Sequence, residues 1–199
     1  MTHSPARRAL IVVLGLLAVL WLVQFVNVSM GYALDADFAI RAHVLTSLPD
    51  IFSAPLLHLS WAHIEGNTLP FLILGFLAAL RGLKKFIYAS GIIILTSGLT
   101  VWLLAPAGSF TVGASGLIAG WLGYVMLRGL MDHRLSDILL GFVAAVLYLG
   151  AFDFLPNNSG ISWQDHLGGF IGGLLAAYLL RTTRKRTESE GGNSDECHH

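Results

Sequence analysis

The chain has few charged residues, and one long stretch has none. Only 12% of its 199 residues are Asp, Glu, Lys or Arg, whereas a soluble domain carries about 25%. Residues 86–127 contain no charged side chain, and the mean hydropathy is +0.69. That stretch is too long for one membrane span of about 20 residues and fits two. The composition therefore excludes a soluble domain and predicts a membrane protein with several spans.

Other scarce features exclude further classes of protein. The single cysteine, Cys197, rules out an intrachain disulfide framework and a cysteine-based metal cluster. The formal net charge is zero, so no basic excess points to nucleic acid. The sequence shows no internal repeat of the kind that many transporters have. We therefore expect no cofactor, no metal ion and no nucleic-acid partner.

Apolar runs predict an all-α polytopic membrane protein with six transmembrane helices. The expected spans cover roughly residues 9–30, 61–80, 86–104, 115–130, 137–152 and 163–180, within a membrane domain at 9–181. The first run is longer than the about 7–15 apolar residues of a signal peptide, so we expect a retained span. Residues 1–8 form the N-terminus, residues 31–60 an external loop, and residues 182–199 a polar tail that is expected to be disordered.

The distribution of basic residues predicts the orientation in the membrane. Eleven of the 12 lysines and arginines fall on one face of the six-span arrangement, and Arg41 falls on the other. Basic residues concentrate on the cytoplasmic side of membrane proteins. We therefore expect both termini in the cytoplasm and a multi-pass location in the plasma membrane of a bacterial cell. The eleven are Arg7, Arg8, Arg81, Lys84, Lys85, Arg128, Arg134, Arg181, Arg184, Lys185 and Arg186.

One serine stands among glycines at the start of the fourth expected span. Gly113 and Gly116 remove side chains on both sides of Ser115, so another backbone can approach its hydroxyl. A serine at a helix start is usually just an N-cap. However, a span of about 16 residues covers only about 24 Å of a core about 30 Å thick. Ser115 is therefore expected below the membrane surface, where irregular backbone needs a buried or water-filled pocket.

Three polar side chains share the depth of this serine. His63 and Asn67 lie one helical turn apart at the outer end of the second span, and His166 lies in the outer part of the sixth. A lone histidine in a membrane is more often structural, but convergent polar groups at one depth indicate function. His58 could join His63 and His166 as a metal ligand, but the serine and the asparagine are poor partners for zinc.

Glycines indicate how these groups can meet. Pairs spaced four apart let helix backbones pack closely. Such pairs would bring the fourth and sixth spans together and place the His166 ring near the Ser115 hydroxyl, although they also serve plain helix association. The pairs are Gly116 with Gly120, Gly168 with Gly172, and Gly169 with Gly173.

Three segments together resemble the rhomboid family of intramembrane serine proteases. They are HLSWAHIEGN at 58–67, GASG at 113–116 and HLGGFIGG at 166–173. Their order, spans and spacing all fit, and the resemblance covers nearly the whole chain to residue 180. It implies a rhomboid-like bundle that cleaves transmembrane helices of other membrane proteins near the outer side of the bilayer.

The resemblance also implies a role for each site residue. Ser115 would be the nucleophile and His166 the general base. The side chains of His63 and Asn67, with the Ser115 N–H, would bind the oxyanion. The supporting residues would be His58, Gly113 and Gly116.

Two features near the serine call for separate expectations. The family commonly has an aromatic residue four positions after the serine, and here that position is Ala119. We expect a gap there that Ala119→Phe would fill, raising turnover, unless Trp121, Tyr124 or Phe170 already occupies the space.

Neighbours on a helix point about 100° apart, so Asp165 is not expected to orient His166. A Ser–His dyad is thus favoured over a triad, and Asp165→Asn should cost far less than His166→Ala.

Two other functions remain open at this stage. One is an inactive rhomboid-like protein that binds transmembrane clients without cutting them, although such relatives usually lack the serine or the histidine. The other is a small transporter, which would need polar positions through the depth of the spans. Here the polar groups cluster near the outer side.

Overall fold

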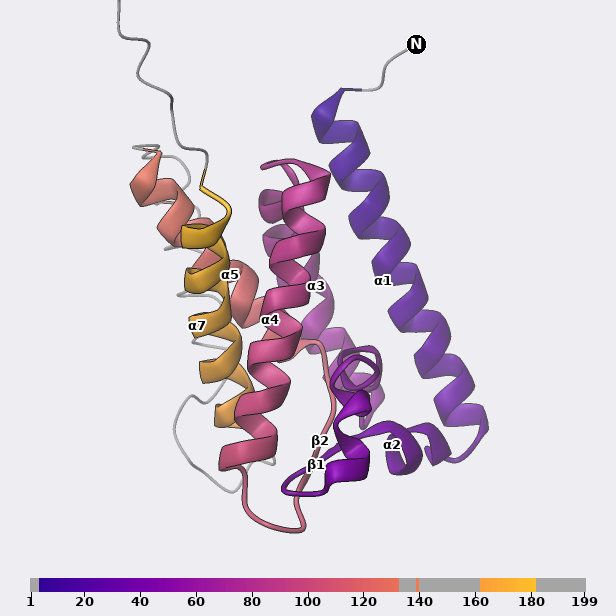
Figure 1. Ribbon diagram of the computed structural model, residues 1–199. Coiled ribbons are helices and arrows are strands. Elements are labelled where there is room, and N and C mark those ends of the chain that lie inside the picture. Colours follow the sequence, from indigo (N-terminus) through magenta and orange to yellow (C-terminus); the bar gives the residue numbers. More distant parts are fainter. Residues whose placement is uncertain (1–3, 133–138, 140–161, 182–199) are drawn as a thin grey trace, which may run out of the picture.

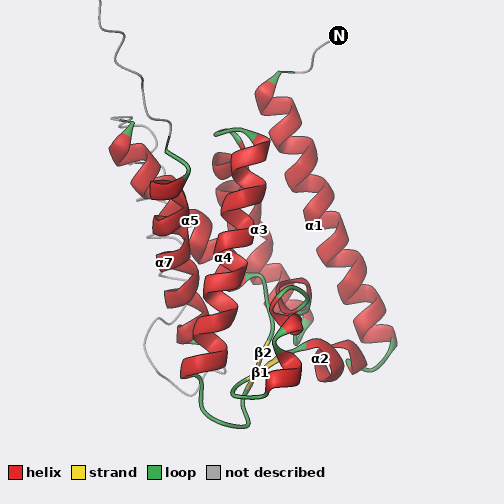
Figure 2. Ribbon diagram, in the orientation of Figure 1, coloured by secondary structure: helices red, strands yellow, loops and turns green. Residues whose placement is uncertain are grey.

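The computed structural model describes residues 4–132, 139 and 162–181 (Figure 1). The expected fifth span and the polar tail lie outside the described residues, as do residues 1–3. Within the described ranges the chain is helical apart from connecting loops and one very small sheet (Figure 2). The six-span count and the domain limits therefore remain predictions.

Five helices match expected spans. Helices α1 (Pro5–Ser29), α3 (Trp61–Ala79) and α4 (Leu83–Leu104) are long and apolar enough to cross a membrane. Helices α5 (Ser115–Met131) and α7 (Trp163–Leu179) have 17 residues each. They correspond to the first, second, third, fourth and sixth expected spans.

Helix α1 begins earlier than the sequence pattern indicates. Ser4 caps it, because the Ser4 side chain accepts a hydrogen bond from the Arg7 N–H at 3.3 Å. Pro5 occupies the first turn, where a missing N–H costs nothing. Much of α1 is exposed, including large apolar side chains such as Leu22 and Phe25. This is the surface that a lipid-facing helix presents.

Helix α7 lies against both α4 and α5, and α1 packs on α3 at the opposite side of the bundle (Figure 1). Helix α5 is central, since most of its side chains are buried. Both α5 and α7 start from the same end of the molecule (Figure 1), which is what a span between them requires.

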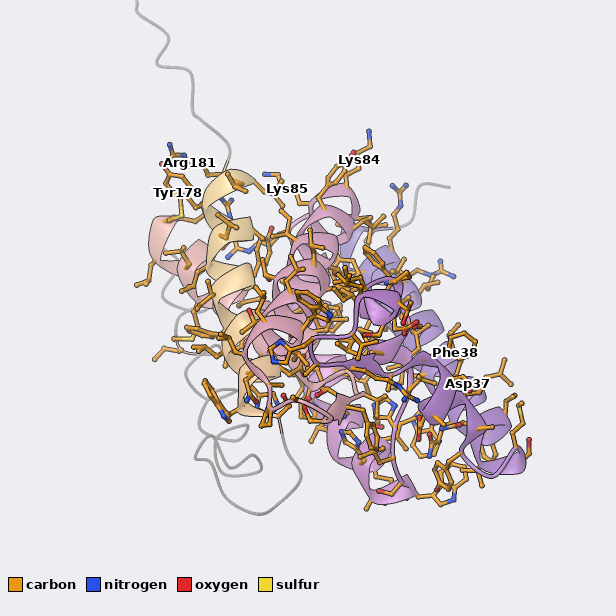
Figure 3. The ribbon with its side chains drawn as sticks, turned by 60° about the horizontal axis from the view of Figure 1, so that its bottom comes forward. Asp37, Phe38, Lys84, Lys85, Tyr178 and Arg181 are labelled. Atoms are coloured by element: carbon orange, nitrogen blue, oxygen red, sulfur yellow. The ribbon has the colours of Figure 1, made fainter. Side chains whose placement is uncertain are left out.

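The two ends of the bundle differ in their side chains. Figure 3 shows Lys84, Lys85 and Arg181 at the end that also holds the start of α1, away from Asp37 and Phe38. These three basic residues thus lie at one end, as the expected orientation requires.

The loop at residues 31–60 has secondary structure of its own. It contains α2 (Ala33–Phe38) and three short 3₁₀ turns, at Leu45–Ser47, Pro49–Ile51 and Ala54–Leu56. Strand β1 (Ile40–Arg41) pairs antiparallel with β2 (Phe110–Thr111), with Ile40 opposite Thr111. Strands of two residues are too short for an alternating pattern, so the sequence did not predict this sheet.

The sheet positions the segment that leads into α5. Residues 112–116 are buried, and the Gly113 N–H donates to the Ala54 carbonyl at 2.9 Å. The loop before Ser115 therefore dips into the protein, as expected from the shortness of the fourth span.

Candidate active site

Ser115 is the first residue of α5, but it does not cap the helix. The N-cap is Ala114, and no side chain on this segment provides a capping hydrogen bond. The Ser115 side chain is directed to α7 instead, where its hydroxyl donates to Asp165 Oδ2 at 3.2 Å. The N-cap alternative is thus excluded, and a buried serine hydroxyl faces the helix that carries His166.

Helices α5 and α7 meet backbone against backbone. A Cβ at Gly169 would collide with the Gly116 carbonyl, and a Cβ at Gly173 would collide with the Gly120 carbonyl. A Cβ at Gly120 would lie 2.8 Å from the Gly169 carbonyl oxygen. The expected close packing of the fourth and sixth spans is confirmed.

The second glycine pair of α7 serves a different neighbour. A Cβ at Gly168 would lie 2.5 Å from Thr100 Oγ1, and one at Gly172 would collide with Thr96 Oγ1. Both threonines belong to α4. The first three turns of α7 therefore contact α5 on one face and α4 on another, so side chains on both faces are buried.

His166 lies in the first turn of α7 and is fully buried. Ser162 caps this helix by accepting a hydrogen bond from the Asp165 N–H at 3.3 Å. His63, from the first turn of α3, is close enough to His166 to interact with it electrostatically. Asn67, one turn further along α3, is 1% exposed. The predicted polar residues thus lie at one end of the bundle.

Gly113 separates His63 from the nucleophile. Its φ of +129° is a conformation that favours glycine. A Cβ there would lie 2.8 Å from His63 Cε1 and 3.8 Å from Ser115 Oγ. Glycine is therefore required both by the backbone conformation and by the His63 ring, which packs against the chain just before Ser115.

The missing side chain at Gly116 leaves space for a carboxyl group as well as for the approach of another helix backbone. A Cβ at Gly116 would collide with Asp165 Oδ1 and with Ser97 Oγ. Ser97, on α4, donates to the Asp165 carbonyl oxygen at 2.8 Å and also contacts Asp165 Oδ1. Asp165 is thus directed at Ser115 and Ser97, a contact that the helical angle between Asp165 and His166 did not predict.

The sequence contains a partial signal for this contact. Asp165 stands beside His166, and the helical angle correctly separates the two side chains. The angle between neighbouring side chains on one helix does not show that α5 covers the face of α7 to which Asp165 points. Ser97 carries no signal, because an isolated serine in an apolar helix is common.

His58 lies behind His63, before α3 begins. The two rings are 5.0 Å apart, edge to face, and His58 is fully buried. Burial, with the charge of His63 as a smaller cause, lowers the pKa of His58 from 6.5 to about 3. His58 therefore packs against His63 as a buried, neutral ring.

Low pH should destabilise the protein partly through His58. Between pH 6.5 and about 3 the unfolded chain protonates this ring and the folded protein does not, so stability falls as pH falls. His58→Gln removes this contribution. We expect the drop in melting temperature from pH 7.5 to pH 5, measured in detergent, to be smaller in His58→Gln than in the unmodified protein. An equal drop in both would contradict a buried neutral His58.

The expected gap at Ala119 is not present. Ala119 is 0% exposed, whereas a void of ring size would leave its methyl group accessible to water. Trp121 does not fill the position, because its ring packs on Phe71 and Phe86, 4.8 Å and 5.3 Å away between ring centroids. The Phe170 ring lies against Gly123, one turn deeper on α5.

Ala119→Phe is therefore expected to overpack the bundle. Overpacking costs about 1–3 kcal/mol, so we expect lower thermal stability and lower activity rather than higher turnover. Leu95→Phe is the control, since Leu95 is 43% exposed on α4. Higher turnover of Ala119→Phe at unchanged stability would restore the gap interpretation.

No group of three potential metal ligands exists among the residues that the structure describes. His58 and His63 come together edge to face, in a site that also holds a serine and an asparagine. The donor set therefore suits hydrogen bonding and proton transfer better than metal binding.

Comparison with known proteins decides the family. The family model of the Rhomboid domain matches residues 45–183, which include all the residues of the candidate site. The chain belongs to the rhomboid family. This is a family of integral membrane proteins that includes membrane serine proteases, and the apolar helices of this rhomboid protein fit it.

Relatives of this rhomboid protein fall into two groups. An uncharacterized protein of Mycobacterium tuberculosis is 39% identical over 186 residues, which cover 89% of this chain and 77% of that protein. The rhomboid protease GlpG of Haemophilus influenzae is 30% identical over 142 residues, 68% of this chain and 71% of that protein. The rhomboid protease GluP of Bacillus subtilis is 30% identical over 129 residues, 63% of this chain and 24% of that protein.

Proposed function

We propose that this rhomboid protein is an intramembrane serine endopeptidase. Its nucleophile is Ser115 and its general base is His166, and it cuts transmembrane helices of other membrane proteins near the outer side of the bilayer. One observation carries the proposal. In a member of this family, a buried serine hydroxyl at the start of α5 faces the first turn of α7, which bears a buried histidine.

The chemistry follows from the residues present. A serine hydroxyl is a weak nucleophile until an adjacent base takes its proton. His166 takes that proton as Ser115 Oγ attacks the scissile carbonyl, and then gives it to the leaving amine. Water, activated by the same histidine, releases the acyl group and restores the serine.

The negative oxygen of the tetrahedral intermediate needs donors that are already in place. The Ser115 N–H lies at the start of a helix, where backbone N–H groups have no partner within the helix. The Asn67 amide and the His63 ring are the side-chain donors in the proposal. Removing one such donor costs about 10²–10³ in rate, so Asn67→Ala and His63→Ala should be slow rather than inactive.

Access of a substrate requires movement. Ser115 is 7% exposed and His166 is 0% exposed, so a substrate reaches them only after the surrounding elements move apart. A peptide bond within an intact helix is not open to attack, and the substrate helix must unwind locally. Residues with low helix propensity near the cleavage site lower that cost by up to about 1 kcal/mol for glycine.

The proposed orientation places both termini in the cytoplasm and the active site outside. It can be tested by cysteine accessibility in a Cys197→Ser background. We expect Arg184→Cys to be protected from an impermeant thiol reagent added to intact cells, and Asp37→Cys to react. If both cysteines react in intact cells, both positions lie outside. If neither reacts in intact cells but both react after lysis, both lie in the cytoplasm. Either result would place them on one side and contradict six spans.

Labelling with a serine-directed fluorophosphonate tests the proposed function. The purified protein in detergent should be labelled, and Ser115→Ala should not. Ser90→Ala is a matched control, because Ser90 is a helix serine that accepts a hydrogen bond from Trp121 Nε1, at 3.0 Å, away from the site. A folded protein that resists the probe, or labelling that survives in Ser115→Ala, would contradict the proposal.

A further inference from the structure

Asp165 is a buried carboxyl group that contacts three residues of the site. It is 7% exposed. Its Oδ2 accepts from Ser115 Oγ at 3.2 Å, and its Oδ1 contacts Ser97 Oγ of α4. The Gly116 backbone also donates to this carboxyl. Buried polar groups in a membrane are costly unless they are hydrogen-bonded, and here both carboxyl oxygens have partners.

Part of this arrangement stabilises α5. Helix α5 has no capping side chain of its own, and the first N–H groups of a helix need acceptors. Asp165 supplies one from the neighbouring helix, where a carboxyl also suits the positive end of the helix dipole. A cap requires only the contact with the Gly116 backbone. The additional contact with Ser115 Oγ bears on the reacting atom.

The surroundings leave little to replace the carboxyl. Beside Asp165 lies a cavity of about 10 Å³, lined by residues that include Ser97, Val112 and Gly113. This is about the space that one water molecule requires. Loss of the carboxyl would therefore remove an acceptor fixed by α4, and this cavity has room for no more than one water molecule in its place.

We propose that Asp165 is a positioning residue for the Ser115 nucleophile, and that Ser97 fixes the carboxyl that holds it. This inference rests on the proposed function. In the resting protein, the hydrogen bond to Oδ2 restricts the Ser115 rotamer and holds Oγ at one place beside α7. During attack, the hydroxyl proton passes to His166, the bond to Oδ2 breaks, and Asp165 neither gains nor loses a proton. The carboxyl keeps its contact with Ser97.

Two substitutions at Asp165 separate the hydrogen bond from the charge. Asp165→Asn retains an oxygen acceptor of the same shape, and we expect a rate of fluorophosphonate labelling within about 3-fold of the unmodified protein. Asp165→Ala removes the acceptor, and we expect about a 10–100-fold slower rate, because small misplacements of a reacting group can cost about 10²-fold. With a transmembrane substrate, Asp165→Ala should lower kcat and leave KM unchanged, since the buried carboxyl does not reach the substrate.

Ser97→Ala tests the second half of the proposal without altering the carboxyl. It removes the α4 contact that fixes Asp165, and we expect about a 3–10-fold slower labelling rate, in keeping with one lost hydrogen bond. Ser90→Ala is the matched control. Ser90 lies two turns away on the same face of α4 and forms a single hydrogen bond, with Trp121. It should label at the unmodified rate.

The outcomes are distinct. Slow labelling in Asp165→Ala and Ser97→Ala, with a near-normal rate in Asp165→Asn, supports the positioning role. Asp165→Asn as slow as Asp165→Ala would show that the charge is required and would overturn the role. Unmodified rates in Asp165→Ala and Ser97→Ala would overturn it and leave the proposed function intact. If Asp165→Ala does not fold, Ser97→Ala against Ser90→Ala decides. A folded parent protein that is not labelled would overturn both proposals.

Discussion

Ser115→Ala and His166→Ala are each expected to abolish cleavage of a transmembrane test substrate while the protein still inserts and folds. The first removes the nucleophile and the second removes the base that activates it. In soluble serine proteases, such losses lower kcat by about 10⁶-fold, which is below detection for a slow membrane enzyme. The measurement is gel-based cleavage in reconstituted vesicles, with melting temperature as the check on folding.

The double variant makes this prediction sharper. Residues that act as a unit are non-additive, so Ser115→Ala with His166→Ala should be no worse than either alone. Substantial residual cleavage in His166→Ala, with folding intact, would identify another base. Asp165 would then be the first candidate, because it already accepts a hydrogen bond from Ser115.

Gly169→Ala is expected to damage both stability and activity. Its Cβ would overlap the Gly116 carbonyl and lie 2.8 Å from the Gly116 carbonyl carbon. Backbone atoms cannot move aside as a flexible side chain can, so α5 and α7 must separate. Overpacking costs about 1–3 kcal/mol, and the shift displaces Ser115 relative to His166. We expect a lower melting temperature and about 10²-fold slower cleavage.

Gly91→Ala is the matched control for this change. Gly91 also lies within a helix, α4, and nothing lies within 4 Å of an added Cβ. Alanine favours a helix over glycine by about 1 kcal/mol, so this variant should be neutral or slightly more stable. Equal behaviour of Gly169→Ala and Gly91→Ala would contradict the backbone contact between α5 and α7.

The sequence predicted the helices and the packing because both follow from simple patterns. Long uncharged runs specify spans, and glycines spaced four apart specify a close helix contact. Both features are present where expected, at α1, α3, α4, α5 and α7 and at Gly116, Gly120, Gly169 and Gly173. The β1–β2 pairing was not predictable, because two-residue strands carry no periodic signal.

The site was predicted less completely, because its details depend on tertiary contacts. Spacing along one helix correctly separates Asp165 from His166, but it does not show that α5 and α4 cover the other face. Likewise, the change from an aromatic residue to Ala119 suggested a gap, since sequence does not reveal which neighbouring atoms cover this methyl group. In both cases the missing information was the position of a neighbouring helix.

The most direct test is mass spectrometry of a transmembrane test substrate incubated with the purified protein in vesicles, with Ser115→Ala in parallel. We predict two new fragments whose junction lies near the outer end of the substrate helix, formed only by the unmodified protein. A substrate that co-purifies with the folded protein and remains intact would contradict the proteolytic function and would indicate a protein that binds transmembrane clients without cutting them.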